Sequence, residues 1–371
     1  MNLAGALHIQ IIRDGSNVLA VDITSSRPRA AQWLSNQPVD ASQARLPLLY
    51  SVCRRAQESV GQAAVAATRG QFAKLAAETA FVILCETTQE HLWRLLLDWP
   101  RQLGLEPLER EFSHWYRCLA ASAKLSAVAD MQTQLAGFDD FVASVVLGMP
   151  CPSWLDLGRP DAIDHGAALA SRLWHTLGED LAADTEGVPW LPVTQASELA
   201  GTLESCWSEE FERHPRWRGE PAETGSLARW RTQPLVAAFL LGHGRGVRAR
   251  LLARLMDLAE CAGFIAEPEA WIASSLLDSC SPLPGVGIAR IETARGTLLH
   301  RVGVESASGR EFIKEYSVVA PTEWNFHPRG AFVAALPTGV KLDTAAFTEA
   351  AHRLVLSLDP CVPYQLEVRH A

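Results

Sequence analysis

The stretch GVGIARIETARGTLLHRVGVESASGREFIKEYSVVAP, residues 285–321, alternates apolar and polar residues in runs of about six. Successive side chains of a strand point to opposite faces, so this alternation is typical of half-buried strands. We therefore predict a small antiparallel sheet in a C-terminal strand region, 285–330. A helical pattern, FTEAAHRLVLSL, follows, and the final segment, 345–371, is predicted to hold this helix and an Asp-Pro-Cys motif.

The other end of the chain also predicts strands. ALHIQIIRDGSNVLAVDI, residues 6–23, reads as two short strands around an Asp-Gly turn, which supplies the positive φ of a tight hairpin. An alanine-rich helical core is predicted over about 43–264, interrupted by the prolines of MPCPSWLDLGRP and by a polar segment, 205–233, that resembles a loop or the rim of a site. No internal repeat or linker divides the chain. We predict one α+β domain, 1–371, predominantly helical, with small antiparallel sheets from the N- and C-terminal regions.

Composition excludes some classes of function. The 371 residues carry a formal net charge of −9, which disfavours nonspecific nucleic-acid binding because that needs a basic surface. The start, MNLAGALHIQIIRDG, lacks a positive segment followed by an apolar one, and no later stretch is long and uncharged, so we expect a cytoplasmic protein without a membrane span. Eight cysteines are present, none in C-x-x-C spacing, and most, such as Cys85 and Cys261, are predicted to be packed thiols.

Three motifs in the C-terminal third carry a resemblance to a known family. ETARGTLLHR at 292–301, EYSVVAPTEWNFHPRG at 315–330 and SLDPC at 357–361 resemble, in order and spacing, the large subunit of nickel-iron hydrogenases. Two N-terminal segments agree more weakly, GALHI at 5–9 and LLYSVCRRAQ at 48–57. The resemblance implies a hydrogenase large-subunit-like helical core and a metal site built from both ends of the chain.

The thiol pattern departs from that family, in which two C-x-x-C pairs hold nickel and iron. The second pair reads Cys361-Val362-Pro363-Tyr364 here, and the first reads Tyr50-Ser51-Val52-Cys53, although Arg55 or Ala56 could also mark the vacated position. Only two thiols remain. Nickel in such a site needs a nearly complete thiolate set, whereas an iron filled by cyanide and carbon monoxide needs few protein ligands, so no nickel is expected.

Further departures point away from turnover. The glutamate that the family places just before its first-strand motif is replaced by Ala4, and the histidine of that motif by Ala6. The family's final histidine, after which a maturation protease cuts, falls at Glu367, and only four residues follow. The resemblance therefore implies neither proton transfer at nickel nor removal of a C-terminal peptide.

Two residues of the family's metal surroundings are retained. Arg295 matches the arginine that overhangs the metal pair, and Asp359 matches the carboxylate that orients it. This combination resembles the HupK/HoxV group of hydrogenase assembly proteins. It implies a non-catalytic scaffold that holds iron, with cyanide and carbonyl ligands, through Cys53 and Cys361 before transfer. The implied partners are a small HypC-like chaperone, the hydrogenase large subunit or other maturation proteins.

Each of these residues also has a structural interpretation. Cys53 could be a buried core thiol, although a helix N-terminus and the adjacent Arg54 and Arg55 are expected to favour its thiolate. Cys361 could belong to a turn that ends a helix, and Arg295 could form a surface salt bridge.

Two other functions stay open from the sequence. One is a metal-free interaction protein that mimics the large subunit and docks maturation factors. The other is a two-cysteine iron enzyme, for which Glu367 or a mobile histidine would have to supply the general base. The four C-terminal histidines, His300, His327, His352 and His370, fit no compact metal site by spacing.

Overall fold

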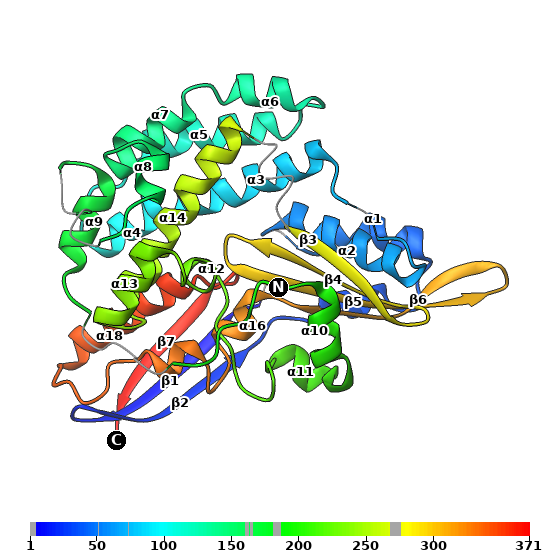
Figure 1. Ribbon diagram of the computed structural model, residues 1–371. Helices are drawn as coiled ribbons and strands as arrows, with labels where there is room; N and C mark the ends of the chain where they lie inside the picture. The colour runs from blue at the N-terminus through cyan, green and yellow to red at the C-terminus, as the bar shows by residue number, and fades with distance from the viewer. Residues whose placement is uncertain are drawn as a thin grey trace.

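Segments from the two ends of the chain form one sheet (Figure 1). β1 (Leu7–Asp14) and β2 (Asn17–Ser25) form an antiparallel hairpin, and β7 (Tyr364–His370) pairs with β1 in parallel, which gives the strand order β2-β1-β7. The turn residue Gly15 has a φ of +54°, as the Asp-Gly step predicts. The hairpin is therefore confirmed, whereas the parallel strand β7 was not predicted and makes this sheet mixed.

The computed structural model of the chain describes residues 5–50, 52–72, 74–159, 163, 166–180, 187–267 and 276–371. Ala4, the position of the family's lost glutamate, lies outside this range, as does Ser51 in the first cysteine motif.

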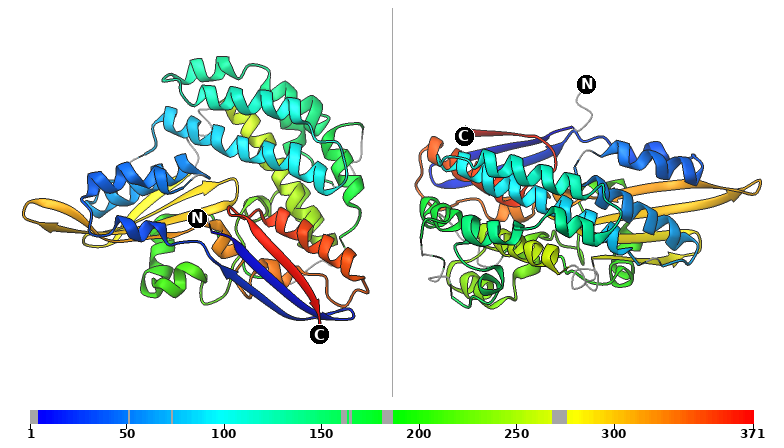
Figure 2. Two further views of the ribbon diagram at one scale, coloured as in Figure 1. Left: turned by 180° about the vertical axis from the view of Figure 1, so that it is seen from behind. Right: turned by 90° about the horizontal axis from the view of Figure 1, so that it is seen from above.

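The second sheet is the one that the alternating stretch predicts. Its four strands are antiparallel in sequence order: β3 (Leu277–Leu283), β4 (Val286–Thr293), β5 (Gly296–Ala307) and β6 (Arg310–Val319). It begins earlier than residue 285 because β3 precedes the predicted region. β4 and most of β5 are buried, since helices cover the sheet (Figure 2).

One helix packs closely on this sheet. α2 (Arg54–Thr68) lies against β4 and β5, and a Cβ on Gly287 of β4 would come within 1.9 Å of the carbonyl oxygen of Ala64. Only glycine permits this approach. The predicted helical core is broken near its start, because α1 (Val39–Leu49) ends before Tyr50 and α2 starts after Cys53, whose φ of +54° is left-handed.

The other helices form a layer beside this sheet (Figures 1 and 2). In chain order they are α3 (Ala77–Leu92), which continues through a π-helical turn, Trp93–Asp98, into α4 (Trp99–Gln102); α5 (Glu109–Ser122); α6 (Val128–Gln134); α7 (Phe138–Phe141), extended by a π-helical turn, Val142–Leu147; α8 (Cys151–Leu155); α9 (Leu169–Leu177); α12 (Ser226–Trp230); α13 (Pro234–His243); and α14 (Val247–Ala266). The proline-rich MPCPSWLDLGRP thus holds a short helix, α8, in which Pro152 occupies an early position that needs no amide hydrogen bond.

Five further helices lie near the sheets. They are α10 (Ala196–Leu203), α11 (Glu209–Arg213), α16 (Pro321–Asn325), α17 (Ala331–Ala334) and α18 (Thr344–Leu358). The C-terminal helix is therefore confirmed as α18, and α11 falls within the segment predicted as a loop or rim. Asp359 ends α18 in a left-handed conformation, and Pro360 and Cys361 then lead into β7.

Buried apolar residues gather in separate clusters. The largest joins the helical layer to α2 and the four-stranded sheet, and a second joins β1 to α17 and α18. These elements confirm the predicted α+β fold with a predominantly helical core. Within the described residues, no helix is both long and apolar enough to cross a membrane.

Candidate functional site

The two thiols singled out in the sequence meet in one small cavity. Cys53 enters from the start of α2 and Cys361 from the turn after α18, and both line a space of about 60 Å³. Both side chains are half-buried, and neither forms a disulfide. The cavity is lined by Arg27, Pro28, Ala30, Leu49, Tyr50, Val52, Cys53, Gln57, Thr293, Arg295, Leu298, Ala320, Pro321, Cys361 and Val362.

The α2 N-terminus presents Cys53. Its first free amides are capped from α3, because the Glu86 carboxylate accepts hydrogen bonds from the N–H of Arg55 at 2.8 Å and of Ala56 at 3.1 Å. Glu86 thus anchors the helix start beside the cavity. Cys53 itself is contacted by a guanidinium, with Arg295 Nη1 at 3.6 Å from its sulfur.

Cys361 is held by a different pair of residues. Thr322 Oγ1 donates to the Cys361 sulfur at 3.1 Å and also accepts from the Cys361 backbone N–H at 3.0 Å. Arg27 Nη1 donates to the same sulfur at 3.3 Å and lies 3.3 Å from Glu323 Oε1. Each thiol is therefore faced by one guanidinium, Arg295 for Cys53 and Arg27 for Cys361.

Asp359 binds three arginines beneath the cavity. Its Oδ1 accepts from Arg94 Nε at 2.7 Å and from Arg295 Nε at 3.2 Å, and its Oδ2 lies 3.1 Å from Arg254 Nη2. Asp359 is 1% exposed and Arg295 is 4% exposed. Arg295 is therefore not the surface salt bridge of the alternative interpretation, and its remaining Nη2 donates to Glu90 Oε2 at 2.7 Å.

This cluster fixes the charge of the carboxylate. Burial alone would raise the pKa of Asp359, but the guanidinium groups of Arg295, Arg94 and Arg254 outweigh it and hold that pKa well below its usual range. Burial likewise opposes the charge of Arg27, and the neighbouring Cys361 and Glu323 outweigh it, so the pKa of Arg27 is raised.

The surroundings of Cys53 differ from the expectation. Burial raises the pKa of the Cys53 thiol, and Arg295 offsets only part of that rise. Arg54 and Arg55 are exposed, and Arg55 pairs with Glu58 on the helix surface. The prediction that these two arginines favour the thiolate is therefore wrong, because burial dominates and a different arginine contacts the sulfur.

The positions that replace the family's other metal-site groups lie elsewhere. Tyr364, at the vacated cysteine position, starts β7, and its hydroxyl contacts His352 Nδ1 at 3.0 Å. Glu367, at the position of the family's final histidine, is exposed in β7 and hydrogen-bonds to Gln10 and Arg369. Neither residue lines the thiol cavity.

Several residues of the site were missed in the sequence. Thr322 lies inside the motif EYSVVAPTEWNFHPRG, so the sequence did contain a pattern that could have marked it as a site residue. Arg27, Arg94 and Arg254 lie outside every motif, and no local pattern marks them because their partners are distant in the chain.

The four C-terminal histidines each hydrogen-bond to another residue of the protein. His300 is fully buried between Tyr316 and Gln57, to which its two ring nitrogens are hydrogen-bonded. Across the part of the chain that the structure describes, no group of three or more His, Cys, Asp or Glu side chains converges on a point where a metal ion could bind.

Comparisons with known proteins agree with the motifs. The chain is 30% identical to the hydrogenase expression/formation protein HoxV of Cupriavidus necator, over 93% of this chain and 92% of that protein. It is 28% identical to the hydrogenase expression/formation protein HupK of Azotobacter vinelandii, over 100% of both chains. No protein-family model matches the sequence.

Solved structures share the fold. The reduced nickel-iron-selenium hydrogenase from D. vulgaris Hildenborough superimposes with a TM-score of 0.63 at 14% identity, covering 95% of each chain. An NAD+-reducing nickel-iron hydrogenase gives a TM-score of 0.60 at 15% identity, covering 95% of this chain and 94% of that one. With full-length relatives at up to 30% identity, the chain belongs to the HoxV/HupK family of hydrogenase expression/formation proteins.

Proposed function

We propose that this protein is a non-catalytic scaffold in hydrogenase formation. It would hold an iron unit with cyanide and carbonyl ligands through Cys53 and Cys361 before the unit passes to a hydrogenase large subunit. The observation that carries the proposal is the single cavity lined by both thiols, with one guanidinium facing each. The names of the relatives support a role in hydrogenase expression or formation.

The chemistry of the cavity suits such a cargo. Thiolates are good ligands for iron, and two of them would bind it less firmly than four, which is what a carrier that must release its cargo requires. Cyanide is anionic and accepts hydrogen bonds, and guanidinium groups are donors that remain charged when buried beside an anion. Arg295 and Arg27, which contact the two sulfurs, would donate hydrogen bonds to the cyanide ligands of an iron bound there.

The partners follow from this role. A small HypC-like chaperone would deliver or receive the iron unit, and a hydrogenase large subunit or other maturation proteins would take part in the transfer. The large-subunit fold of this chain supports the idea that such partners engage it as they engage their hydrogenase target.

Infrared spectroscopy tests the proposal directly. The protein would be purified anaerobically from a host with its maturation genes, and cyanide and carbonyl stretching bands would be recorded together with iron and nickel content. We expect bands and iron without nickel in the wild type, and loss of both bands and iron in Cys53→Ser and Cys361→Ser. Cys206→Ser is the matched control, because Cys206 is an exposed free thiol away from the cavity.

Two outcomes would contradict the carrier. Absence of bands and iron from a wild-type protein that supports hydrogenase maturation in the same cells would favour the metal-free docking protein. Turnover by the purified protein that is lost in Cys361→Ser would favour the two-cysteine iron enzyme.

A further inference from the structure

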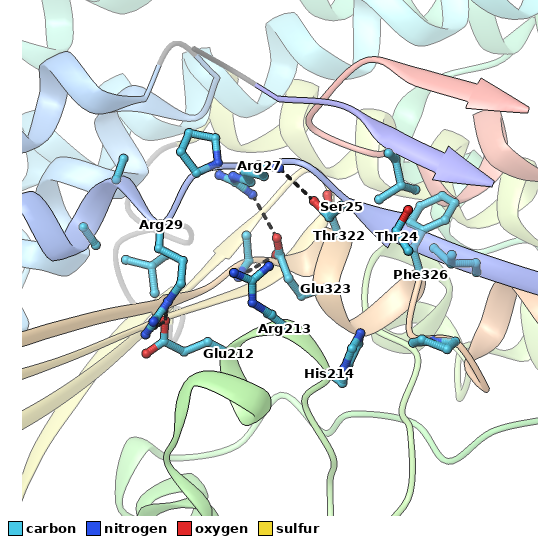
Figure 3. Close-up of a pocket in the computed structure, with 18 of the residues that line it drawn as sticks. Thr24, Ser25, Arg27, Arg29, Glu212, Arg213, His214, Thr322, Glu323 and Phe326 are labelled. Carbon is cyan, nitrogen blue, oxygen red and sulfur yellow. Dashed lines mark hydrogen bonds and ion pairs between the residues drawn. The ribbon is translucent and has the colours of Figure 1, made fainter. Parts of the chain in front are cut away.

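A larger chamber adjoins the thiol cavity (Figure 3). It has a volume of about 490 Å³ and lies between the end of β2, the segment that follows β2, and helices α11 and α16. Five residues line both this chamber and the thiol cavity: Arg27, Pro28, Ala30, Tyr50 and Ala320. Two residues that line the chamber, Arg27 and Thr322, also contact the Cys361 sulfur, so the chamber lies next to this thiol.

One wall of the chamber is a strand edge. Four consecutive residues of β2, from Asp22 to Ser25, line it, and β2 is an outer strand of the β2-β1-β7 sheet. An outer strand offers backbone N–H and C=O groups along its free side, and an extended peptide satisfies them as an added strand.

The chamber is lined by three arginines and three carboxylates, namely Arg27, Arg29 and Arg213 and Asp22, Glu212 and Glu323. Arg27 lies 3.3 Å from Glu323 and Arg29 lies 2.8 Å from Glu212, while Arg213 pairs at 3.3 Å with Glu209, which does not line the chamber. A small anion would have to displace these carboxylates, whereas a neutral peptide backbone needs no net charge from the walls. The charge balance thus favours a peptide over an ionic small molecule.

We propose that an extended segment of a partner protein enters this chamber as an added strand along β2 and reaches the neighbourhood of Cys361. The inference rests on the proposed function, since the partner is the protein that delivers the iron unit. A volume of about 490 Å³ admits a short stretch of chain and not a folded domain.

Arg27 would lie between the docked partner segment in the chamber and the two cysteines in the thiol cavity. Its guanidinium spans the boundary between the two spaces, bound to Cys361 on one side and Glu323 on the other, and its Cζ lies 5.8 Å from the centre of the Tyr50 ring. A backbone carbonyl of the incoming segment is an acceptor that Arg27 could bind in place of Glu323. Arg27 would therefore contact the docked segment as well as the Cys361 sulfur.

A substitution that fills the chamber with a large side chain tests whether a partner segment docks there. Thr24→Trp places a large ring in the chamber from an exposed position, and Ala20→Trp places the same ring on the same face of β2 but outside the chamber. In the maturation host, we expect Thr24→Trp to lower the infrared bands of the purified protein by about tenfold or more, the change that a docking cost of about 1.4 kcal/mol produces. Ala20→Trp should retain wild-type bands. Wild-type bands in Thr24→Trp would overturn the proposal.

Site-specific crosslinking gives a readout that does not depend on iron. A photoreactive phenylalanine analogue at Ser25, which lines the chamber, is compared with the same analogue at Trp93, which lines a separate groove of about 690 Å³ on the other side of Cys361. We expect a crosslink from position 25 to one short peptide of a hydrogenase assembly protein. A partner crosslink only from position 93 would place docking at the other groove and overturn the inference. If the wild type held no iron but position 25 still crosslinked, the carrier function would fail while the docking site stood.

Discussion

At the scale of single residues, Asp359 balances the charges beneath the two thiols. Three guanidinium groups surround a carboxylate that is 1% exposed and therefore largely shielded from solvent. Removing one partner of a buried ion pair leaves the other uncompensated, which costs far more than loss of an exposed pair. The site therefore depends on Asp359 for its stability as well as for the placement of Arg295.

The substitution Asp359→Asn tests this balance. We expect it to lower the free energy of unfolding by about 3–5 kcal/mol in urea titrations at neutral pH. Asp98→Asn is the control, because Asp98 pairs with the same Arg94 at a position that is 23% exposed, and its loss should cost about 1 kcal/mol or less. Equal effects of the two substitutions would show that the buried network is not what holds the site.

The pH dependence of the same variant follows from the depressed pKa of Asp359. A carboxyl group whose pKa is lowered on folding stabilises the protein above its unfolded pKa, and the stabilisation is lost as pH falls toward the folded pKa. The difference between wild type and Asp359→Asn should therefore be constant from neutral pH to about pH 5 and shrink below about pH 4, near the unfolded pKa of Asp. A difference that shrinks already between pH 7 and pH 5 would contradict this origin.

The residues that the motifs singled out lie together in the structure. Arg295 contacts both Asp359 and Cys53, and Cys53 and Cys361 line one cavity, while their roles toward a metal stay a prediction. The direction of the Cys53 pKa was wrong, because adjacency in sequence to Arg54 and Arg55 says nothing about burial. Arg27, Arg94 and Arg254 were missed because their partners are distant in the chain, and no local sequence pattern marks such contacts.

At the scale of elements, the contact of α2 with the four-stranded sheet positions Cys53. The helix lies so close to β4 that Gly287 has no room for a side chain, and any separation of the two would move the helix start that bears the thiol. The glycine is thus a packing requirement of the site, although it lies far from the cavity in sequence.

Gly287→Ala measures this requirement. The added methyl would collide with the Ala64 backbone, so we expect a loss of about 1–3 kcal/mol in the free energy of unfolding, the usual cost of overpacking a core. Gly201→Ala is the matched control, because Gly201 lies inside α10 with open space around it, and alanine there should stabilise by up to about 1 kcal/mol. A neutral Gly287→Ala would mean that α2 and β4 separate easily.

The pairing of β7 with β1 leads to a second prediction at the scale of elements. Deleting residues 364–371 removes β7 and leaves only Pro363 to pair with Leu7 on that side of β1, so the amides of Ile9 and Ile11 should exchange with solvent much faster, as measured by hydrogen exchange. Deleting only 370–371 leaves most of the ladder in place and is the control. Unchanged protection in the longer deletion would show that β1 is held by β2 alone.

The elements show what a single sequence indicates and what it does not. Alternating patterns predicted both antiparallel regions, and helical periodicity predicted α14 and α18. The alternation of Tyr364, Leu366 and Val368 with polar residues was a signal for β7 too, but its parallel pairing joins positions too distant for any local pattern. The break at Cys53 was hidden because a left-handed cysteine has no signature like that of glycine.

At the scale of the whole molecule, the site links the core clusters. α2 belongs with the largest apolar cluster and α18 with the one around β1, while the network of Asp359 with Arg254 of α14 and Arg295 of β4–β5 joins them. The contacts around the site therefore involve elements from both ends and from the middle of the chain. That the whole chain forms one domain stays a prediction.

Calorimetry tests that prediction. If the clusters unfold together, heating should give a single transition whose calorimetric and van't Hoff enthalpies agree. Two resolved transitions, or one that splits in Asp359→Asn but not in Asp98→Asn, would show that the clusters are separate units and that the buried ion network couples them.

The parallel pair of β1 and β7 has a consequence for the order of events in the cell. Contacts between the two strands span 357 residues, as for His8 with Gln365, so β1 leaves the ribosome long before its partner is made. The cavity likewise lacks Cys361 until translation has passed that codon. The proposed iron unit could therefore be bound by both thiols only after this point of translation, and a nascent chain stalled earlier would present Cys53 without Cys361.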